Sequence, residues 1–170
     1  MMFNDLLDAN ARYAADFRLA ELRPQAAKHF ALVTCIDSRI EPLTALGLVP
    51  GDAKILRNAG GRVTDDVLRS VAIAVAGLGV TRVAVMHHTD CAMATSTEAL
   101  RAKVAQSARG GVGDVELHAI EDADVALVAD VETLRSSSLV PADLEVAGWR
   151  YDVTTGRITT VVGAPNRTGD

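Results

Sequence analysis

The chain has 170 residues, of which 49% are hydrophobic and 23% are charged, and its formal net charge is −5. This length and composition predict one globular domain. The negative charge and the scattered lysines and arginines argue against nucleic acid as a partner. Its longest apolar stretch, residues 71–80, is too short to cross a bilayer, and the N-terminus lacks the pattern of a secretory signal. We therefore expect a cytoplasmic protein with no membrane partner.

The first predicted element is a helix over residues 3–22, where apolar residues recur at helical spacing. Either Asn4 or Asp5 is placed to cap it. Since Pro24 closes this segment, we expect residues 1–24 to form a helical arm that packs on a partner subunit. The alternative is a helix that packs on the core of its own chain.

The first ninety residues alternate predicted strands with predicted helices. Continuous apolar runs, rather than alternating ones, are typical of strands covered on both faces, as in a parallel sheet. Thr64 is placed to cap the longer helix, and Gly79 to end it. Ligands of such sheets bind at the carboxyl ends of the strands, where Cys35, Asn58 and His88 fall. The strands are expected at residues 30–34, 53–56 and 82–86, and the helices at 41–46 and 65–78.

The remaining residues predict two further helices and a hairpin. The helices are expected at residues 91–107 and 121–135, and the hairpin strands at 145–153 and 157–162, with Gly156 in the turn. The fold class is therefore α/β. We expect a mostly parallel central β-sheet flanked by helices, with an N-terminal helical arm and a C-terminal antiparallel hairpin strand, in a single domain over residues 1–170.

Both cysteines of the chain lie where a predicted strand ends. Cys35 follows the first strand, Cys91 follows the third, and His88 stands three residues before Cys91. Two thiolates and an imidazole are the ligands of a zinc ion that keeps one coordination position open. A structural zinc site usually has four strong ligands, so three ligands favour a catalytic site. His87 could also be the ligand, but only His88 has the H-x-x-C spacing, so we expect His87 either to be packed in the core or to support the ligands from behind.

Two other interpretations of the cysteines remain open. A buried cysteine often behaves as a small hydrophobic residue. A disulfide between Cys35 and Cys91 is the second, although a reducing compartment disfavours it. The polar residues around both cysteines and the close His88–Cys91 pair favour a metal site.

Two charged residues closely follow the first cysteine. Asp37 could take the fourth metal position, which would close the site. Alternatively, it pairs with Arg39 and accepts a hydrogen bond from water on the metal. Arg39 stays protonated, so it would hold Asp37 ionised and away from the metal. A plain turn with solvated charges is the simpler alternative, and the nearby ligand favours the functional one.

A glycine-containing segment follows the second predicted strand. Asn58, Ala59 and Gly60 are candidate substrate-pocket residues, because a glycine lets the backbone approach a small molecule closely. The alternative is an ordinary turn.

These residues resemble the β-class carbonic anhydrases, and most of all a compact bacterial branch of that family. The matching motifs are C-x-D-S-R at residues 35–39, R-N-A-G at 57–60 and H-x-x-C at 88–91. Residues 151–156 look like the closing strand of the family. The similarity extends from about residue 30 to residue 163, and the motifs follow one another in the same order as in the family.

The resemblance implies a function and a site. It implies zinc held by Cys35, His88 and Cys91, with Asp37 and Arg39 as a dyad that gates the fourth position. The reaction would be reversible hydration of carbon dioxide to bicarbonate and a proton by metal-bound hydroxide. Members of the family assemble as dimers or tetramers, so a homodimer or homotetramer is implied.

Three other functions are compatible with the same residues. Hydrolases of carbonyl sulfide or carbon disulfide share this architecture and these ligands. A catalytically silent zinc-binding regulatory module would keep Asp37 on the metal. A small redox protein would use Cys35 and Cys91 directly.

Overall fold

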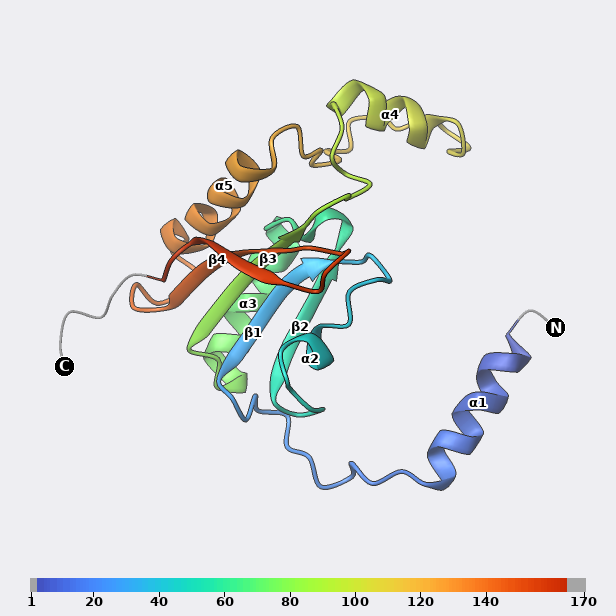
Figure 1. Ribbon diagram of the computed structural model, residues 1–170, viewed down its shortest axis with the longest axis vertical. Coiled ribbons are helices and arrows are strands. Elements are labelled where there is room, and N and C mark those ends of the chain that lie inside the picture. Colours follow the sequence, from blue (N-terminus) through green and yellow to red (C-terminus); the bar gives the residue numbers. More distant parts are fainter. Residues whose placement is uncertain (1–2, 165–170) are drawn as a thin grey trace.

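The computed structural model describes residues 3–164, and its five strands form one sheet (Figure 1). They are β1 (Phe30–Cys35), β2 (Ala53–Asn58), β3 (Arg82–His88), β4 (Glu145–Tyr151) and β5 (Ile158–Val162). Their order is β2-β1-β3-β4-β5. β1 pairs in parallel with β2 and β3, and β3 pairs in parallel with β4. Only β5 runs antiparallel, against β4, which confirms the predicted mostly parallel sheet and the closing hairpin.

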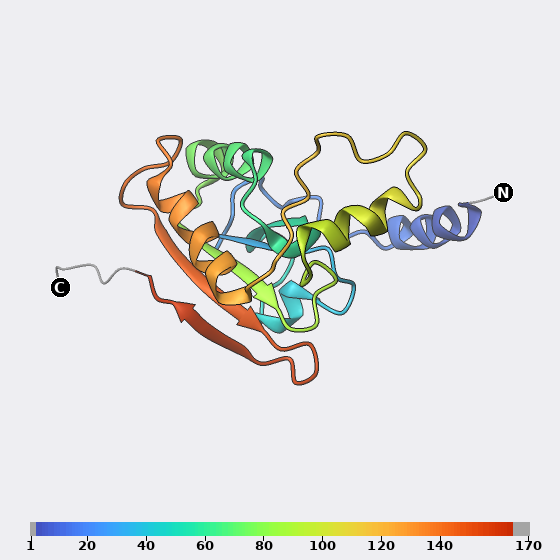
Figure 2. The same ribbon diagram turned by 90° about the horizontal axis from the view of Figure 1, so that it is seen from above.

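Two long helices cover one face of the sheet (Figure 2). They are α3 (Asp65–Leu78) and α5 (Ala123–Ser136). The valines of β1 and β3 that point to this face, such as Val33 and Val85, are fully buried with Val71 of α3 and Leu127 of α5. The shorter helical elements are α1 (Asn4–Ala15), α2 (Pro42–Ala45), the 3-10 turn η1 (Ala59–Gly61) and α4 (Thr97–Ala105).

A second apolar cluster lies on the opposite face of the sheet. Leu32 and Met86 form its fully buried centre, together with Ile40, and Leu46 packs against it after α2. β1 and β3 are therefore apolar on both faces because both faces are covered, as their continuous apolar sequences predict.

The carboxyl ends of three neighbouring strands meet at one edge of the sheet. Cys35, Asn58 and His88 are the last residues of β1, β2 and β3, which confirms their predicted placement. Cys35 stands directly opposite Asn58 in the register. This edge therefore holds the side chains that the sequence singles out as a site.

The long helices largely end where the sequence predicts. Thr64 is the residue before α3, although its side chain accepts no capping hydrogen bond, and Gly79 ends that helix with a φ of +73°. In the hairpin, Gly156 has a φ of +69°. A left-handed backbone at these two positions favours glycine.

The helix predicted over residues 91–107 is wrong in its first third. Residues 91–96 form turns, and α4 begins only at Thr97. Ser96 caps this helix, because its hydroxyl oxygen accepts a hydrogen bond from the Ala99 amide at 3.2 Å. The Ile120 amide donates to the Met93 carbonyl at 2.8 Å, which ties the turns to the segment before α5.

The N-terminal helix is shorter than predicted and lies apart from the sheet (Figure 1). It ends at Ala15 rather than near residue 22. The predicted cap at Asn4 or Asp5 is wrong, since both residues already lie inside the helix and Phe3 precedes it. None of the described side chains of α1 is buried. Residues 1–2 of the predicted arm, and 165–170 of the predicted domain, lie outside the described residues.

None of the helices within residues 3–164 is both long enough and apolar enough to cross a membrane.

Candidate metal centre

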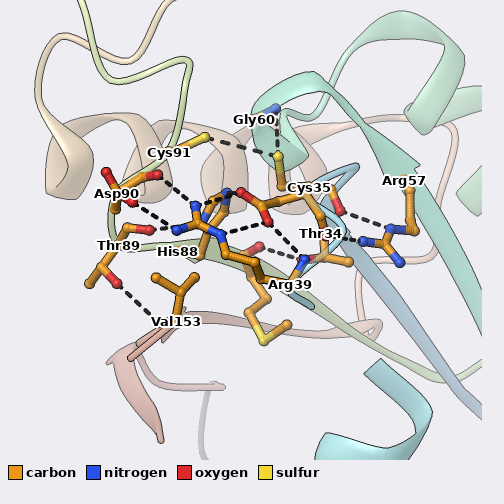
Figure 3. Close-up of polar contacts among 12 residues, drawn as sticks. Thr34, Cys35, Arg39, Arg57, Gly60, His88, Thr89, Asp90, Cys91 and Val153 are labelled. Atoms are coloured by element: carbon orange, nitrogen blue, oxygen red, sulfur yellow. Dashed lines mark hydrogen bonds and ion pairs between the residues drawn. The ribbon is translucent and has the colours of Figure 1, made fainter. Parts of the chain in front are cut away.

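Three predicted ligands converge at the carboxyl edge of the sheet (Figure 3). The ligand atoms of Cys35, His88 and Cys91 all lie within 4.8 Å of one another. Cys35 and His88 are buried, and Cys91 is partly exposed. The two sulfur atoms are 3.9 Å apart and both thiols are free, so the alternative of a disulfide does not hold in this structure.

The histidine presents an unused nitrogen to the two sulfur atoms. Its Nδ1 lies 2.8 Å from the Thr89 carbonyl oxygen. A carbonyl only accepts, so the proton belongs on Nδ1, and Nε2 of His88 carries a free lone pair. That Nε2 atom is buried and has no hydrogen-bond partner among the described residues. A buried acceptor without a partner, next to two thiols, fits the donor set of a zinc site.

The two thiols ionise very differently. The hydrogen bond from Cys91 lowers the pKa of Cys35 from 9.0 to about 4 against the effect of burial, and the Gly60 amide acts in the same direction. The neighbouring Cys35 sulfur and burial raise the pKa of Cys91 far above its usual range. Burial alone would lower the pKa of His88, but Cys35 raises it. Ionisation of one thiol therefore opposes ionisation of the other, and a divalent cation bound to both sulfur atoms would remove that opposition.

Asp37 lies beside the three ligands and is held by Arg39. Arg39 donates from Nε to Oδ1 at 3.0 Å, from Nη2 to Oδ2 at 2.7 Å and from its backbone amide to Oδ1 at 2.9 Å. These bonds hold the pKa of Asp37 well below its usual range. Asp37 Oδ2 is 3.9 Å from Nε2 of His88. The carboxylate thus faces the guanidinium while it stays close to the ligand cluster.

Arg39 has a second acidic partner that sequence reasoning missed. Its Nη1 donates to Oδ2 of Asp90 at 2.7 Å, and its Nη2 donates to the Asp90 carbonyl oxygen at 2.9 Å (Figure 3). Asp90 has a φ of +53° and directly precedes Cys91. Arg39 therefore joins the loop after β1, which directly follows Cys35, to the loop after β3, which carries Cys91.

Arg57 is another contact that the sequence did not reveal. It donates from Nε to the Cys35 carbonyl oxygen at 2.9 Å and from Nη2 to the Asp37 carbonyl oxygen. These contacts fix the backbone between the first cysteine and the carboxylate. The R-N-A-G motif contains Arg57, but a motif alone does not say which carbonyl groups its arginine reaches.

The three candidate pocket residues have separate surroundings. The Gly60 amide donates to Sγ of Cys35 at 3.3 Å, so this residue belongs to the ligand cluster. Asn58 bonds Arg62 instead, through both its side-chain oxygen and its side-chain nitrogen. Asn58 and Ala59 also line a cavity of about 530 Å³, and none of the three ligands lines it.

His87 is buried, as expected. Its Nε2 lies 3.0 Å from Oδ2 of Asp130. The same oxygen accepts a hydrogen bond from Nε of Arg62 at 2.7 Å. Sequence reasoning missed Arg62 and Asp130, since 68 residues separate them and neither belongs to a recognisable motif.

Comparison with known proteins identifies the family. Residues 30–158 match the family model for carbonic anhydrase. Beta-carbonic anhydrase 1 of Mycobacterium tuberculosis is 33% identical over 158 residues, which cover 93% of this chain and 96% of that protein. Carbon disulfide hydrolase of an Acidianus strain is 29% identical over 183 residues, which cover 92% of this chain and 89% of that protein. The crystal structure of a carbonic anhydrase from Streptococcus mutans has a TM-score of 0.87 and 40% identity, and covers 95% of this chain and 98% of that one.

The chain belongs to the carbonic anhydrase family. Its relatives place it in the β class, so the resemblance seen in the sequence is confirmed, and so is the expectation of a carbonic anhydrase enzyme. Hydration of carbon dioxide is the general activity of this family.

Proposed function

We propose that this enzyme catalyses the zinc-dependent, reversible hydration of carbon dioxide to bicarbonate and a proton. The observation that carries the proposal is the convergence of two thiols and a partnerless imidazole nitrogen within 4.8 Å, beside a carboxylate. Cys35, His88 and Cys91 would hold the ion. A zinc ion bound there supplies the acidity that makes water a nucleophile near neutral pH.

The carboxylate is proposed to orient the attacking water. Asp37 is placed to accept a hydrogen bond from that water, which would direct an oxygen lone pair at the carbon of the substrate. Arg39 would keep Asp37 ionised and turned away from the ligand cluster, since it bonds both carboxylate oxygens. In a closed state, Asp37 would leave Arg39 and become a fourth ligand. The short distance of 3.9 Å from Asp37 to His88 supports this second position.

The small substrate is proposed to approach along the turn after β2. Asn58, Ala59 and Gly60 would form one wall of its path. Gly60 supports this proposal most directly, because its amide contacts the Cys35 sulfur. A molecule as small and apolar as carbon dioxide needs little room and few hydrogen bonds.

A second candidate substrate class follows from the similarity to carbon disulfide hydrolases. Carbonyl sulfide and carbon disulfide are linear triatomic molecules like carbon dioxide, and the same ligands would serve their hydrolysis. One batch of purified enzyme should be assayed by stopped-flow hydration of carbon dioxide and by hydrolysis of both sulfur compounds. We expect kcat/KM to be highest for carbon dioxide. A higher value for either sulfur compound would replace the proposed function with the second one.

We also propose that the enzyme is a homodimer or homotetramer in which α1 packs on a partner subunit. The support is an apolar helix face that none of residues 3–164 covers. Phe3 and Leu7 are each 65% exposed, and Leu6 and Tyr13 are exposed as well. A patch of this kind on a soluble protein favours an interface.

Light scattering after size-exclusion chromatography tests this assembly. The change of Leu6 and Leu7 to aspartate should lower the mass toward that of a smaller assembly, because two charges would enter the interface. Arg12→Glu, which changes a charge on the side of α1 opposite the apolar face, is the control. An unchanged mass for the double variant would contradict packing of α1 on a partner.

A cytoplasmic location is part of the same proposal, because both thiols must stay reduced to bind a metal. Fractionation of cells that express the chain checks it. Recovery outside the cytoplasm, with Cys35 and Cys91 oxidised, would contradict it.

A further inference from the structure

The η1 turn packs closely against the carboxyl end of β1. Its Gly60 amide donates to Sγ of Cys35 at 3.3 Å. A Cβ atom on Gly61 would lie 2.9 Å from the carbonyl carbon of Thr34, so the two backbones are in close contact. Gly60 and Gly61 have φ values of +83° and +69°. Glycine backbones are permissive, so the direction of this amide depends on restraints outside the turn.

Arg62 supplies most of those restraints. Its backbone amide donates to Oδ1 of Asn58 at 2.9 Å, and Nδ2 of Asn58 donates back to the Arg62 carbonyl oxygen at 2.8 Å. Nη1 of Arg62 reaches the carbonyl oxygens of His118 and Ala119 at 3.0 and 3.1 Å. Its Nε donates to Oδ2 of Asp130 at 2.7 Å. The residue directly after the turn is thus tied to three separate segments.

Asp130 connects this arrangement to a helix of the core. It projects from α5, is 3% exposed, and also accepts hydrogen bonds from the Val63 amide at 3.1 Å and from His87 at 3.0 Å. Although burial alone would raise the pKa of Asp130, its bonds to His87 and Arg62 hold that pKa below the usual range. A carboxylate buried so deeply is tolerated only with such partners, so its position is tightly defined.

We propose that Asp130 is a positioning residue of the metal centre, which acts through Arg62 and Val63 to aim the Gly60 amide at the sulfur of Cys35. This inference rests on the proposed metal site. A hydrogen bond to a thiolate withdraws charge from the sulfur and fixes its orientation, and such partners tune a metal site without touching the metal. Asp130 would therefore set how strongly Cys35 donates charge, from a helix that contributes no ligand.

Cobalt(II) is a suitable probe, because the absorption of a thiolate–cobalt centre reports charge donation by sulfur. Metal-free wild type and Asp130→Asn should each be titrated with Co²⁺, and both the charge-transfer band and the affinity recorded. Without the Gly60 hydrogen bond the sulfur electrons lie higher in energy, so the band of the variant should move to longer wavelength. Its affinity for Co²⁺ should fall by about 10- to 100-fold.

Leu134→Ala is the matched control for a loss of stability. Leu134 lies one helical turn further along α5 and is fully buried in the core. The Leu134→Ala substitution should lower the melting temperature about as much as Asp130→Asn. It should leave the cobalt charge-transfer band and the affinity for Co²⁺ at their wild-type values. Arg62→Met is a second variant, which leaves Asp130 with its other two partners. It should shift the band in the same direction by a smaller amount.

The outcomes separate this inference from the proposed function. A wild-type band in folded Asp130→Asn and Arg62→Met would overturn the role of Asp130. So would an equal shift in Leu134→Ala, since that would reflect general loosening. If wild type gave no thiolate–cobalt band at all, the proposed metal site itself would be wrong.

Discussion

Two arginine–aspartate pairs flank the first cysteine, and they differ in burial. On one side, the side chains of Arg39 and Asp37 are 43% and 16% exposed. On the other, those of Arg62 and Asp130 are 15% and 5% exposed. An exposed pair contributes little to stability, whereas breaking a buried one is costly. This difference agrees with the roles proposed above, in which the first pair serves the reaction and the second positions the backbone around the cysteine.

The cysteine between the two pairs should show the largest effect. Cys35→Ser replaces a thiolate ligand with a hydroxyl, so zinc per chain should fall from stoichiometric to near zero and hydration should become undetectable. Metal analysis by mass spectrometry and stopped-flow assay check this. Stoichiometric zinc in the variant would remove Cys35 from the ligand set.

The next largest effect on activity is expected at the exposed Asp37–Arg39 pair. Asp37→Ala should retain zinc, because three ligands remain, and should lower kcat/KM by about 10²-fold, because the attacking water would lose the group that orients it. Glu41→Gln removes an exposed carboxylate nearby and is the control. Near-normal activity in Asp37→Ala would show that Asp37 has no part in the chemistry.

Disruption of the buried Arg62–Asp130 pair should mainly lower the free energy of unfolding. Asp130→Asn leaves Arg62 without its charged partner, which should reduce the free energy of unfolding by about 3–5 kcal/mol at pH 7. Asp37→Ala should cost no more than about 1 kcal/mol. Urea denaturation of both variants measures the contrast. Equal losses would mean that burial does not separate the two pairs.

The stability difference at Asp130 should depend on pH. The pKa of Asp130 is lowered in the folded protein, so the unfolded chain binds this proton more readily. Its contribution is thus present above the unfolded value of about 3.9 and is lost as pH falls through the folded value. The gap between wild type and Asp130→Asn in urea should therefore be full at pH 7 and narrow below pH 4. A gap that stays constant with pH would contradict the paired carboxylate.

The smallest effect is expected at the outer partner of Arg39. The side chain of Asp90 is 79% exposed, and Asp37 still holds the guanidinium when this partner is neutral. Asp90→Asn should change the activation free energy by less than about 1 kcal/mol. A loss as large as that of Asp37→Ala, in the same stopped-flow assay, would show that Arg39 depends on both carboxylates.

Much of the fold could be predicted from local patterns. Continuous apolar runs locate the strands that end at Cys35 and His88, and the parallel sheet brings those ends together. The sequence predicts a helix directly after Cys91 because Ala92, Met93 and Ala94 favour helices, but the capping signal at Ser96 is the stronger one. A cap at Asn4 or Asp5 is wrong because α1 already begins at Asn4, so both side chains lie inside the helix rather than before it.

In the site, contacts between residues close in sequence could be predicted, whereas contacts between distant residues could not. Asp37 and Arg39 are two residues apart, so their pairing can be read from the sequence next to a ligand. Arg62 and Asp130 are 68 residues apart and meet only because α5 packs over the sheet beside η1. The bond from Arg39 to Asp90 spans 51 residues and depends on two loops that leave neighbouring strands. Contacts of this kind follow from tertiary packing and have no local signal.

The most direct test of the account is to remove and restore the metal in the wild-type enzyme. A chelator should strip zinc from Cys35, His88 and Cys91 and abolish hydration of carbon dioxide. Activity should then return in proportion to added zinc, up to one ion per chain. Full hydration by demonstrably zinc-free enzyme would contradict the account.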